Sequence, residues 1–268
     1  MGKRFELKRY LQRVGYDGPV EPTLAVLHAL TAAHSQSIPF ENIDPVLGRP
    51  VELEPGHLYR KLVLDRRGGY CFEENGLFLE ALTRVGFAVR PLSARVRLGT
   101  TDRSEVRMRT HMLIEVALEE GMWLTDVGTG SASLTAALRF EADVVQVTPH
   151  DRRRLVRAND RWYQQVRRGG EWVDVYEFTG EEMPFIDRVV ANWYVSTHPQ
   201  SPFRHHVSVA IACPDGGRVA LSGGRLTVRR RDGSATHRQV AAGREYLTVL
   251  REEFGIDLPS GTRLPVAA

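Results

Sequence analysis

The spacing of apolar residues changes at about residue 87 of this 268-residue chain, and this change constrains the fold more than any other feature. Before it, apolar residues recur at helical spacing, which predicts helices over Phe5–Val14, Thr23–His34, Pro55–Leu64 and Cys71–Val85. After it come short segments rich in Val, Leu and aromatic residues, separated by polar or glycine turns. Such segments are typical of antiparallel strands in a barrel or sandwich, so the chain is expected to be α+β.

The spacing of apolar residues changes a second time at about Pro184. Helical spacing returns there, followed by three strand-like segments and a last predicted helix over Gly243–Phe254. We therefore expect three packed parts: a helical bundle over residues 1–86, an antiparallel β-barrel over 87–183, and an α/β lid with its connecting helix over 184–268.

Charge and cysteine content narrow the possible functions. The formal net charge is only +3, and basic residues are interleaved with acidic ones. Nucleic-acid binders usually concentrate basic residues on one face, so this pattern argues against nucleic acid and suits an anionic small molecule. Cys71 and Cys213 form neither a CxxC pair nor a disulfide framework, and no apolar run resembles a signal peptide or membrane span. We expect a cytoplasmic protein with no membrane partner.

Three further features are expected to be structural. Cys213 lies near the end of an apolar strand and is expected in the core. The runs Arg152–Arg154 and Arg229–Arg231 are expected to be solvated strand faces, with contact to cofactor phosphates as the alternative. The segment 38–53 holds three prolines and a glycine, which predicts an ordered loop instead of a helix.

The segment RRGGYCFEENGLF carries the strongest chemical signal. Gly68 and Gly69 permit a tight turn with positive φ, after which a helix begins at or next to Cys71. The unpaired N–H groups and dipole of a helix N-terminus stabilise a thiolate, and Arg66 and Arg67 could add to this. A reactive cysteine is expected at such a position, with a small buried core residue as the alternative.

A cysteine nucleophile needs a base, and the base needs a group that orients it. His111 opens the predicted strand HMLIEVAL and shares one strand face with Leu113. Asp126 ends the next predicted strand, and a hairpin through residues 119–121 would make the two strands antiparallel neighbours. His111 and Asp126 would then lie side by side. Taken alone, each has a structural alternative: a core histidine, and a turn residue before Gly128.

Gly128 and Gly130 lie in the segment DVGTGSAS, just after this strand. Such a segment could cradle a phosphate or let a ligand approach the backbone, and a simple loop turn is the alternative. The segment does not match the dinucleotide-binding fingerprint, because Ser133 occupies the position of the third glycine and no βαβ unit surrounds it.

Together these motifs resemble the arylamine N-acetyltransferases. RRGGYCFEENGLF is similar to the active-site motif of that family, and IPFEN at 38–42 is similar to the segment upstream of it. THMLIEV and WLTDVGTG resemble its histidine and aspartate strands, and NWYVSTHPQSPF at 192–203 resembles the entry to its third domain. The matches follow the family's order and span about residues 5 to 260. The resemblance implies a cysteine-protease-like core within the three-part fold.

The resemblance also implies a ping-pong reaction that needs no metal. Cys71 would take an acyl group from a thioester, usually acetyl-coenzyme A, and pass it to an aromatic amine or hydrazine. His111 would pair with Cys71, and Asp126 would hold His111. Carried over residue by residue, the acceptor pocket would be lined by Phe40, Val96 and Thr129, and the coenzyme would lie near Gly128, Gly130, Gln200 and Ser201.

Two departures from the family pattern keep other functions open. Thr129 stands where many members have a large aromatic residue, which predicts a wider and more polar pocket. The C-terminal end is shorter than expected for bacterial members, which predicts a reduced lid or tail near the coenzyme. A macrolactam-forming amide synthase of ansamycin-type polyketide pathways would use the same triad with an acyl thioester on a carrier protein. A cysteine hydrolase and a binding module without turnover are the alternatives from other classes, and the intact triad argues against the binding module.

Overall fold

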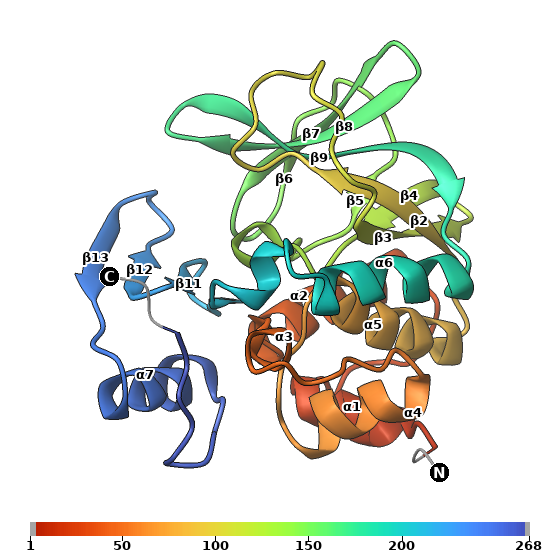
Figure 1. Cartoon of the computed structure of the whole chain (residues 1–268). Coiled ribbons are helices and arrows are strands. Elements are labelled where there is room, and N and C mark those ends of the chain that lie inside the picture. The colour runs from red at the N-terminus through yellow and green to blue at the C-terminus, as the bar shows by residue number, and fades with distance from the viewer. Residues whose placement is uncertain (1–3, 266–268) are drawn as a thin grey trace.

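The computed structural model describes residues 4–265 (Figure 1). Helices dominate its first third, as the apolar spacing predicted. They are α1 (Leu7–Val14), α2 (Leu24–Ser37), α3 (Ile43–Val46), α4 (Pro55–Leu58), a π-helical turn over Tyr59–Leu64, and α5 (Cys71–Val85). The hydroxyl of Thr23 caps α2 by accepting the N–H of Val26, and α1 ends at Gly15 in the left-handed conformation.

The prediction that residues 38–53 contain no helix was wrong. Phe40–Glu41 forms strand β1, and α3 follows within the same segment. The carboxylate of Glu41 accepts the N–H of Ile43 at 2.7 Å, which supplies a partner at the helix start. Pro45 is tolerated because the first turn of a helix has no intrahelical use for its N–H groups.

The middle of the chain folds into one antiparallel eight-stranded sheet that curls into a nearly closed barrel (Figure 1). Its strands are connected in the order β5-β4-β3-β2-β9-β8-β7-β6. The α+β class with a central barrel is therefore confirmed. The strand bounds are β2 (Ala88–Val96), β3 (His111–Leu118), β4 (Gly121–Thr125), β5 (Leu138–Arg139), β6 (Gln146–Val147), β7 (Arg152–Ala158), β8 (Arg161–Arg168) and β9 (Glu171–Glu182).

The last part combines helices with a second antiparallel sheet, of order β1-β10-β11-β12-β13. Its edge strand β1 comes from the helical first third, since Phe40 lies opposite Ala210. The division at residues 86 and 183 stays a prediction. The remaining elements are α6 (Phe185–Thr197), a 3-10 turn (Pro202–Arg204), β10 (Ser208–Ala212), β11 (Arg218–Ser222), β12 (Arg225–Arg229), β13 (Ala235–Gln239) and α7 (Arg244–Phe254).

Strand β3 is buried on both faces, and this positions the start of the strand. Met112 and Ile114 belong to the same core cluster as Phe78 of α5, whereas Leu113 belongs to the cluster inside the barrel. Burial of such side chains contributes about 25 cal/mol per Å² of apolar surface, so α5 is held firmly against β3. The N-terminal ends of α5 and β3 are brought together, and His111 faces the barrel side with Leu113.

Two sequence expectations about surface and core need correction. Arg153 is fully buried instead of lying on a solvated strand face, because its guanidinium finds a carboxylate and a backbone carbonyl inside the protein. Cys213 is only partly buried, although it packs against the core cluster of the second sheet. No helix within residues 4–265 is long and apolar enough to cross a membrane. The cytoplasmic location stays a prediction.

Candidate active site

Helix α5 begins at Cys71, as the sequence predicted. The residue before it, Tyr70, is extended, and its N–H is accepted by the carboxylate of Glu73 at 3.1 Å. The Cys71 side chain is buried, and its Sγ lies 3.5 Å from the carbonyl oxygen of Thr110. The thiol therefore lies at a helix N-terminus, beside the residue that precedes β3.

The two glycines before Cys71 serve a different purpose from the one expected. Gly68 and Gly69 do not have positive φ, and Arg66 is the nearby residue that does, at 53°. A Cβ atom on Gly68 would lie 1.8 Å from the carbonyl oxygen of Pro39, and one on Gly69 would lie 2.6 Å from Cβ of Glu73. The expectation of a positive-φ turn was wrong, because these glycines are needed for close backbone approach.

The arginine upstream of Cys71 is engaged elsewhere. Arg67 donates to the carboxylate of Glu41 at 2.9 and 2.6 Å, and its guanidinium also lies 3.4 Å from Asp44. Lys61 bridges Asp44 and Glu73 at 2.7 and 2.6 Å. These contacts balance buried carboxylates beneath the start of α5, so Arg67 supports the helix instead of contacting the thiol.

His111 and Asp126 are in contact, as the hairpin argument predicted. Ile114 lies opposite Thr125 in the β3–β4 pairing, which makes His111 and Asp126 diagonal neighbours just beyond the last paired residues. The His111 Nε2 to Asp126 Oδ2 distance is 2.8 Å, and both side chains are buried.

Asp126 accepts hydrogen bonds from four donors. Its Oδ2 is bonded by His111 and by the hydroxyl of Thr129, and its Oδ1 accepts Asn75 Nδ2 at 2.8 Å and the N–H of Gly128 at 3.0 Å. Burial alone would raise the pKa of Asp126. The positive charge of His111 and the hydrogen bonds outweigh burial, so the pKa of Asp126 lies below its ordinary value.

The pKa of His111 moves in the opposite direction. Burial would lower this pKa, but the charge and hydrogen bond of Asp126, with a smaller contribution from Cys71, raise it to about 10. His111 is therefore an imidazolium at neutral pH. Asp126 occupies Nε2, which leaves Nδ1 for the thiol of Cys71. A neighbouring imidazolium stabilises a cysteine thiolate.

Asn75 was not identified from the sequence, although it lies one helical turn after Cys71. Its Nδ2 donates to the carbonyl of Met112 at 2.7 Å as well as to Asp126, and its Oδ1 accepts the N–H of Val127 at 3.0 Å. It thus joins α5 to β3 and to the loop after β4. The i, i+4 spacing from Cys71 was the available signal, because it puts both side chains on one helix face.

The glycines after Asp126 lie beside the thiol. A Cβ atom on Gly128 would be 2.7 Å from Cα of Cys71 and 2.9 Å from Nδ2 of Asn75. Gly130 has a φ of 61°, and its α-carbon faces the ring of Phe40. Gly128 is therefore required for the loop to approach the start of α5, and coenzyme contact by either glycine stays a prediction.

A cleft of about 390 Å³ reaches this site, since it is lined by Thr110, whose carbonyl oxygen lies 3.5 Å from the sulfur of Cys71. Three residues expected from the resemblance to face donor or acceptor also line it, together with an aromatic ring from the following 3-10 turn. They are Val96, Gln200, Ser201 and Phe203.

The other two expected pocket residues are packed into the walls around the cysteine. Phe40 is buried with its ring edge against Phe203, at a centroid distance of 6.2 Å. Thr129 is also buried, and its hydroxyl donates to Asp126. Neither is among the described residues that line the cleft. The hydroxyl of Thr129 is thus engaged by the carboxylate instead of being free to make a pocket more polar.

The loop between β2 and β3 forms one wall of the cleft, which the sequence did not predict. Val106 and Met108 of this loop are exposed, and both line the cleft. The buried Arg97, which directly follows β2, donates to the carbonyls of Glu105 and Asp102, and so ties the loop to the barrel.

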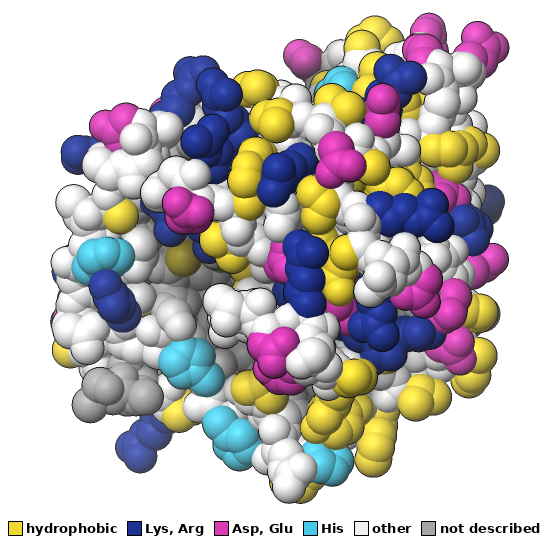
Figure 2. Space-filling model, turned by 90° about the horizontal axis from the view of Figure 1, so that it is seen from above, with side chains coloured by type: hydrophobic (Ala, Val, Ile, Leu, Met, Phe, Trp, Pro, Cys, Tyr) yellow, Lys and Arg dark blue, Asp and Glu magenta, His cyan; other side chains and the backbone are white. Residues whose placement is uncertain are grey.

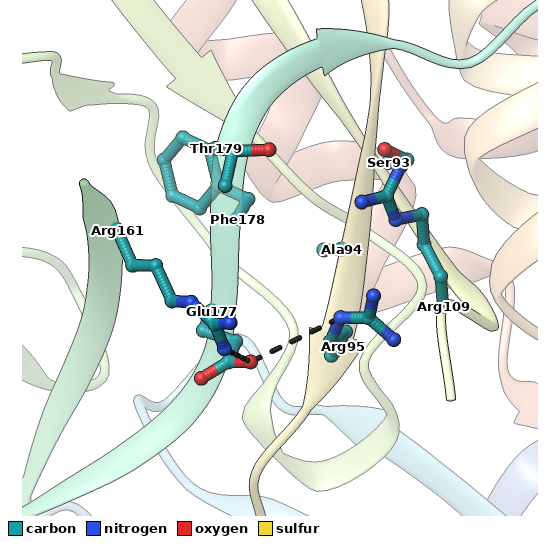
Figure 3. A pocket seen from close by; sticks show the side chains of 8 residues that line it. All are labelled: Ser93, Ala94, Arg95, Arg109, Arg161, Glu177, Phe178 and Thr179. Carbon is teal, nitrogen blue, oxygen red and sulfur yellow. Dashed lines mark hydrogen bonds and ion pairs between the residues drawn. The ribbon is translucent and has the colours of Figure 1, made fainter. Parts of the chain in front are cut away.

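The same part of the barrel carries a small pocket, shown in Figure 3. The side chains of Arg95 and Arg161 point toward the buried carboxylate of Glu177 there, and Arg161 bonds it at 2.7 Å (Figure 3). Ser93 and Arg109 line both this pocket and a second cleft of about 410 Å³, which in turn shares Thr110 with the first. Arginines of β2 and β8 thus stabilise the barrel wall next to the site.

A protein family described as N-acetyltransferase matches residues 23–263. An arylamine N-acetyltransferase of Mycolicibacterium smegmatis is 43% identical over 256 residues, covering 94% of this chain and 92% of the relative. An arylamine N-acetyltransferase of Escherichia coli is 37% identical over 250 residues, covering 93% of this chain and 88% of the relative. Among solved structures, the arylamine N-acetyltransferase of Mycobacterium marinum in complex with CoA aligns with a TM-score of 0.90 at 37% identity, covering 94% of this chain and 93% of that one.

Proposed function

Because this chain belongs to the arylamine N-acetyltransferase family, we propose that Cys71 takes an acetyl group from acetyl-coenzyme A and passes it to an aromatic amine or hydrazine. The enzyme is an N-acyltransferase of the arylamine type. The observation that carries the proposal is the buried series of contacts from the Cys71 thiol through the His111 imidazolium to the Asp126 carboxylate.

In the first half-reaction the thiolate of Cys71 attacks the carbonyl carbon of the acetyl thioester. A carbon–sulfur bond to Cys71 forms, and the carbon–sulfur bond to coenzyme A breaks. The departing coenzyme thiolate takes the proton of His111 and leaves as a thiol. The acetyl group is then held on Cys71, and His111 is neutral and still oriented by Asp126 through the 2.8 Å hydrogen bond.

In the second half-reaction the amine nitrogen attacks the same carbonyl carbon. A carbon–nitrogen bond forms, and the bond to the Cys71 sulfur breaks. The neutral imidazole of His111 takes the proton that the nitrogen loses, which restores the imidazolium and the thiolate. Each turnover therefore ends with both groups in their starting ionisation states.

The cleft at Thr110 suits small aromatic acceptors. Its volume of about 390 Å³ lies within the roughly 300–1,000 Å³ of small-molecule sites. We assign Val96 of its lining to the acceptor, with Phe40 and Thr129 in the wall beside it. We assign the stretch at Gln200 and Ser201 to the coenzyme, together with the glycine loop at Gly128 and Gly130.

Macrolactam closure from a carrier-protein thioester is the alternative reaction for the same triad. None of the relatives named above carries such a name, whereas their names agree on arylamine N-acetyl transfer. A hydrolase would differ in letting water resolve the acyl-enzyme. Product analysis with and without an aromatic amine distinguishes these reactions, because only the acetyltransferase makes the acetylated amine in preference to acetate.

Mass spectrometry of the protein after incubation with acetyl-coenzyme A tests the proposal directly. We expect one acetyl adduct on Cys71, none in Cys71→Ala, and an unchanged adduct in Cys213→Ala, which is the matched cysteine control. An adduct on Cys213, or no adduct with any thioester donor, would contradict the assignment.

A further inference from the structure

Four arginines meet where the barrel contacts the second sheet, and we call them the arginine cluster. They are Arg153 of β7, Arg168 of β8, Arg218 of β11 and Arg229 of β12. Arg153 and Arg218 are 0% and 5% exposed, and the other two are partly buried. Both buried guanidinium groups donate to the same oxygen of Asp151, at 2.7 and 2.6 Å.

The cluster carries more positive charge than its carboxylate offsets. Four guanidinium groups against Asp151 leave a local excess of +3. Arginine keeps its charge in proteins, and a buried charge is costly unless it is paired. The like charges around Arg168 add to burial in lowering its pKa to about 10. Two of these guanidinium groups are buried, unlike the basic side chains visible in Figure 2, which are interspersed with acidic ones over much of that face.

Backbone carbonyls accept hydrogen bonds from only some of the N–H groups in the arginine cluster. Arg168, Arg153 and Arg218 donate to the successive carbonyl oxygens of residues 131–133, at 3.4, 3.0 and 2.9 Å. Nε of Arg153, Nε of Arg168, and both Nε and Nη1 of Arg218 are buried with no hydrogen-bond partner among residues 4–265. Buried donors without an acceptor are rare, because each has lost its hydrogen bonds to water without gaining another.

We propose that the arginine cluster binds a small inorganic anion, a halide or a phosphate-type oxyanion, at the junction of the barrel and the second sheet. An anion supplies acceptors for the unpaired N–H groups of Arg218 and its neighbours and offsets the excess charge. It would also stabilise residues 131–133, and this loop is tied to the active site because the N–H of Thr129 bonds the hydroxyl of Ser133 at 2.9 Å.

Thermal unfolding at constant ionic strength tests the site. The probes are sodium chloride, bromide and phosphate, each titrated against sodium gluconate. We expect a saturable rise in the melting temperature of about 2–4 °C with at least one of these anions. Arg168→Gln should reduce the rise by half or more. Arg167→Gln is the matched control, because Arg167 is the exposed neighbour on the opposite strand face, and it should keep the full rise.

Crystals grown with bromide provide an independent readout, in which anomalous scattering should locate an ion against Arg218. If Arg168→Gln does not fold, Arg229→Gln replaces it in the unfolding series. Three results would overturn the proposal: no saturable response to any anion, equal responses in the Arg167 and Arg168 variants, or, in crystals grown with an anion that gives the response, that anion bound only away from the cluster. A response to coenzyme A but to no inorganic anion would overturn the assignment to an inorganic ligand.

Discussion

The protein contains two buried histidine–carboxylate pairs with similar geometry. His34 Nε2 lies 2.6 Å from Glu74, and His111 Nε2 lies 2.8 Å from Asp126. All four side chains are at most 1% exposed. Glu74 belongs to α5, three residues after Cys71, and Asp126 is bonded by Asn75 of the same helix. Both pairs are therefore next to the N-terminal end of α5.

The two pairs nevertheless hold their protons differently. Burial, and then the positive charge of Arg13, lower the pKa of His34 to about 3. Burial, and then the negative charge of Glu73, raise the pKa of Glu74 well above its ordinary value. Both shifts favour the uncharged form of this pair, whereas the shifts of the other pair favour an imidazolium with a carboxylate.

Burial is the same for both pairs, so the hydrogen-bond donors and charges around each carboxylate decide which pair is charged. Asp126 accepts three donors besides His111, whereas among residues 4–265 Glu74 is bonded, besides its histidine, only by the N–H of Gly69 at 2.9 Å. Each donor to a carboxylate favours the ionised form, and nearby carboxylates such as Glu73 disfavour it. A charged pair next to a thiol stabilises the thiolate. A neutral pair in a core has a smaller desolvation cost.

The largest difference in acetylation activity should come from replacing each carboxylate by its amide. We expect Asp126→Asn to lose about 10⁴-fold in amine acetylation, as expected when an orienting aspartate is replaced by its amide. Glu74→Gln should keep activity within a few-fold, because burial already favours the uncharged form of Glu74 and its side chain does not bond His111 or Asp126. Steady-state acetylation of an arylamine measures both. Equal losses in the two variants would show that charge is not what separates the pairs.

Next in size is the loss of the amide that holds Asp126 in place. Asn75→Ala should slow acetylation of Cys71 by about 10- to 100-fold and destabilise the protein by about 1–3 kcal/mol in urea unfolding. Asn42→Ala is the matched control, because Asn42 also makes three hydrogen bonds through its side-chain amide but does not touch Asp126. It should cost similar stability and leave the acetylation rate near normal. Unchanged acetylation in Asn75→Ala would remove Asn75 from the site.

A smaller effect is expected from a single hydroxyl. Thr129→Val removes one of the four donors to Asp126 and should lower the acetylation rate about 10-fold, the effect of losing one hydrogen bond to a charged group. Thr135→Val is the control, because the buried hydroxyl of Thr135 has no hydrogen-bond partner among residues 4–265. If both variants behave alike in the acetylation assay, the Thr129 hydroxyl is not needed by Asp126.

A pH dependence of stability is also expected, with a slope of at most about 1.4 kcal/mol per pH unit for each histidine. The lowered pKa of His34 by itself would remove stability as the pH falls from 6.5 toward about 3, but the raised pKa of Glu74 acts in the opposite direction above pH 4.5. The His34–Glu74 pair should therefore give no acid slope between pH 4.5 and 6.5. The folded pKa of His111 is raised, so its contribution is present below pH 6.5 and is lost as the pH rises toward about 10. Urea unfolding from pH 6.5 to 9 should lose this alkaline contribution in His111→Gln. An unchanged alkaline slope in His111→Gln would contradict the charged state of that pair.

Much of the site was predictable because its signals are local. Apolar spacing and the preceding glycines indicated that a helix begins at Cys71, and the hairpin length indicated that His111 and Asp126 meet. The reason predicted for Gly68 and Gly69 was wrong, since these residues allow close approach of other segments and do not have positive φ. A local pattern marks where a glycine is needed, but the atom it avoids belongs to a distant segment.

Periodicity and turn chemistry act within a few residues, so the amino-acid sequence was enough to indicate where most helices and strands begin and which residue types stand at their ends. The folded structure was needed to show that β1 joins a distant sheet, that Arg153 is buried, and that Asn75 reaches Asp126. It also decided which histidine is charged. Ionisation depends on the donors and charges that folding gathers around a group, and these come from segments far apart in the chain.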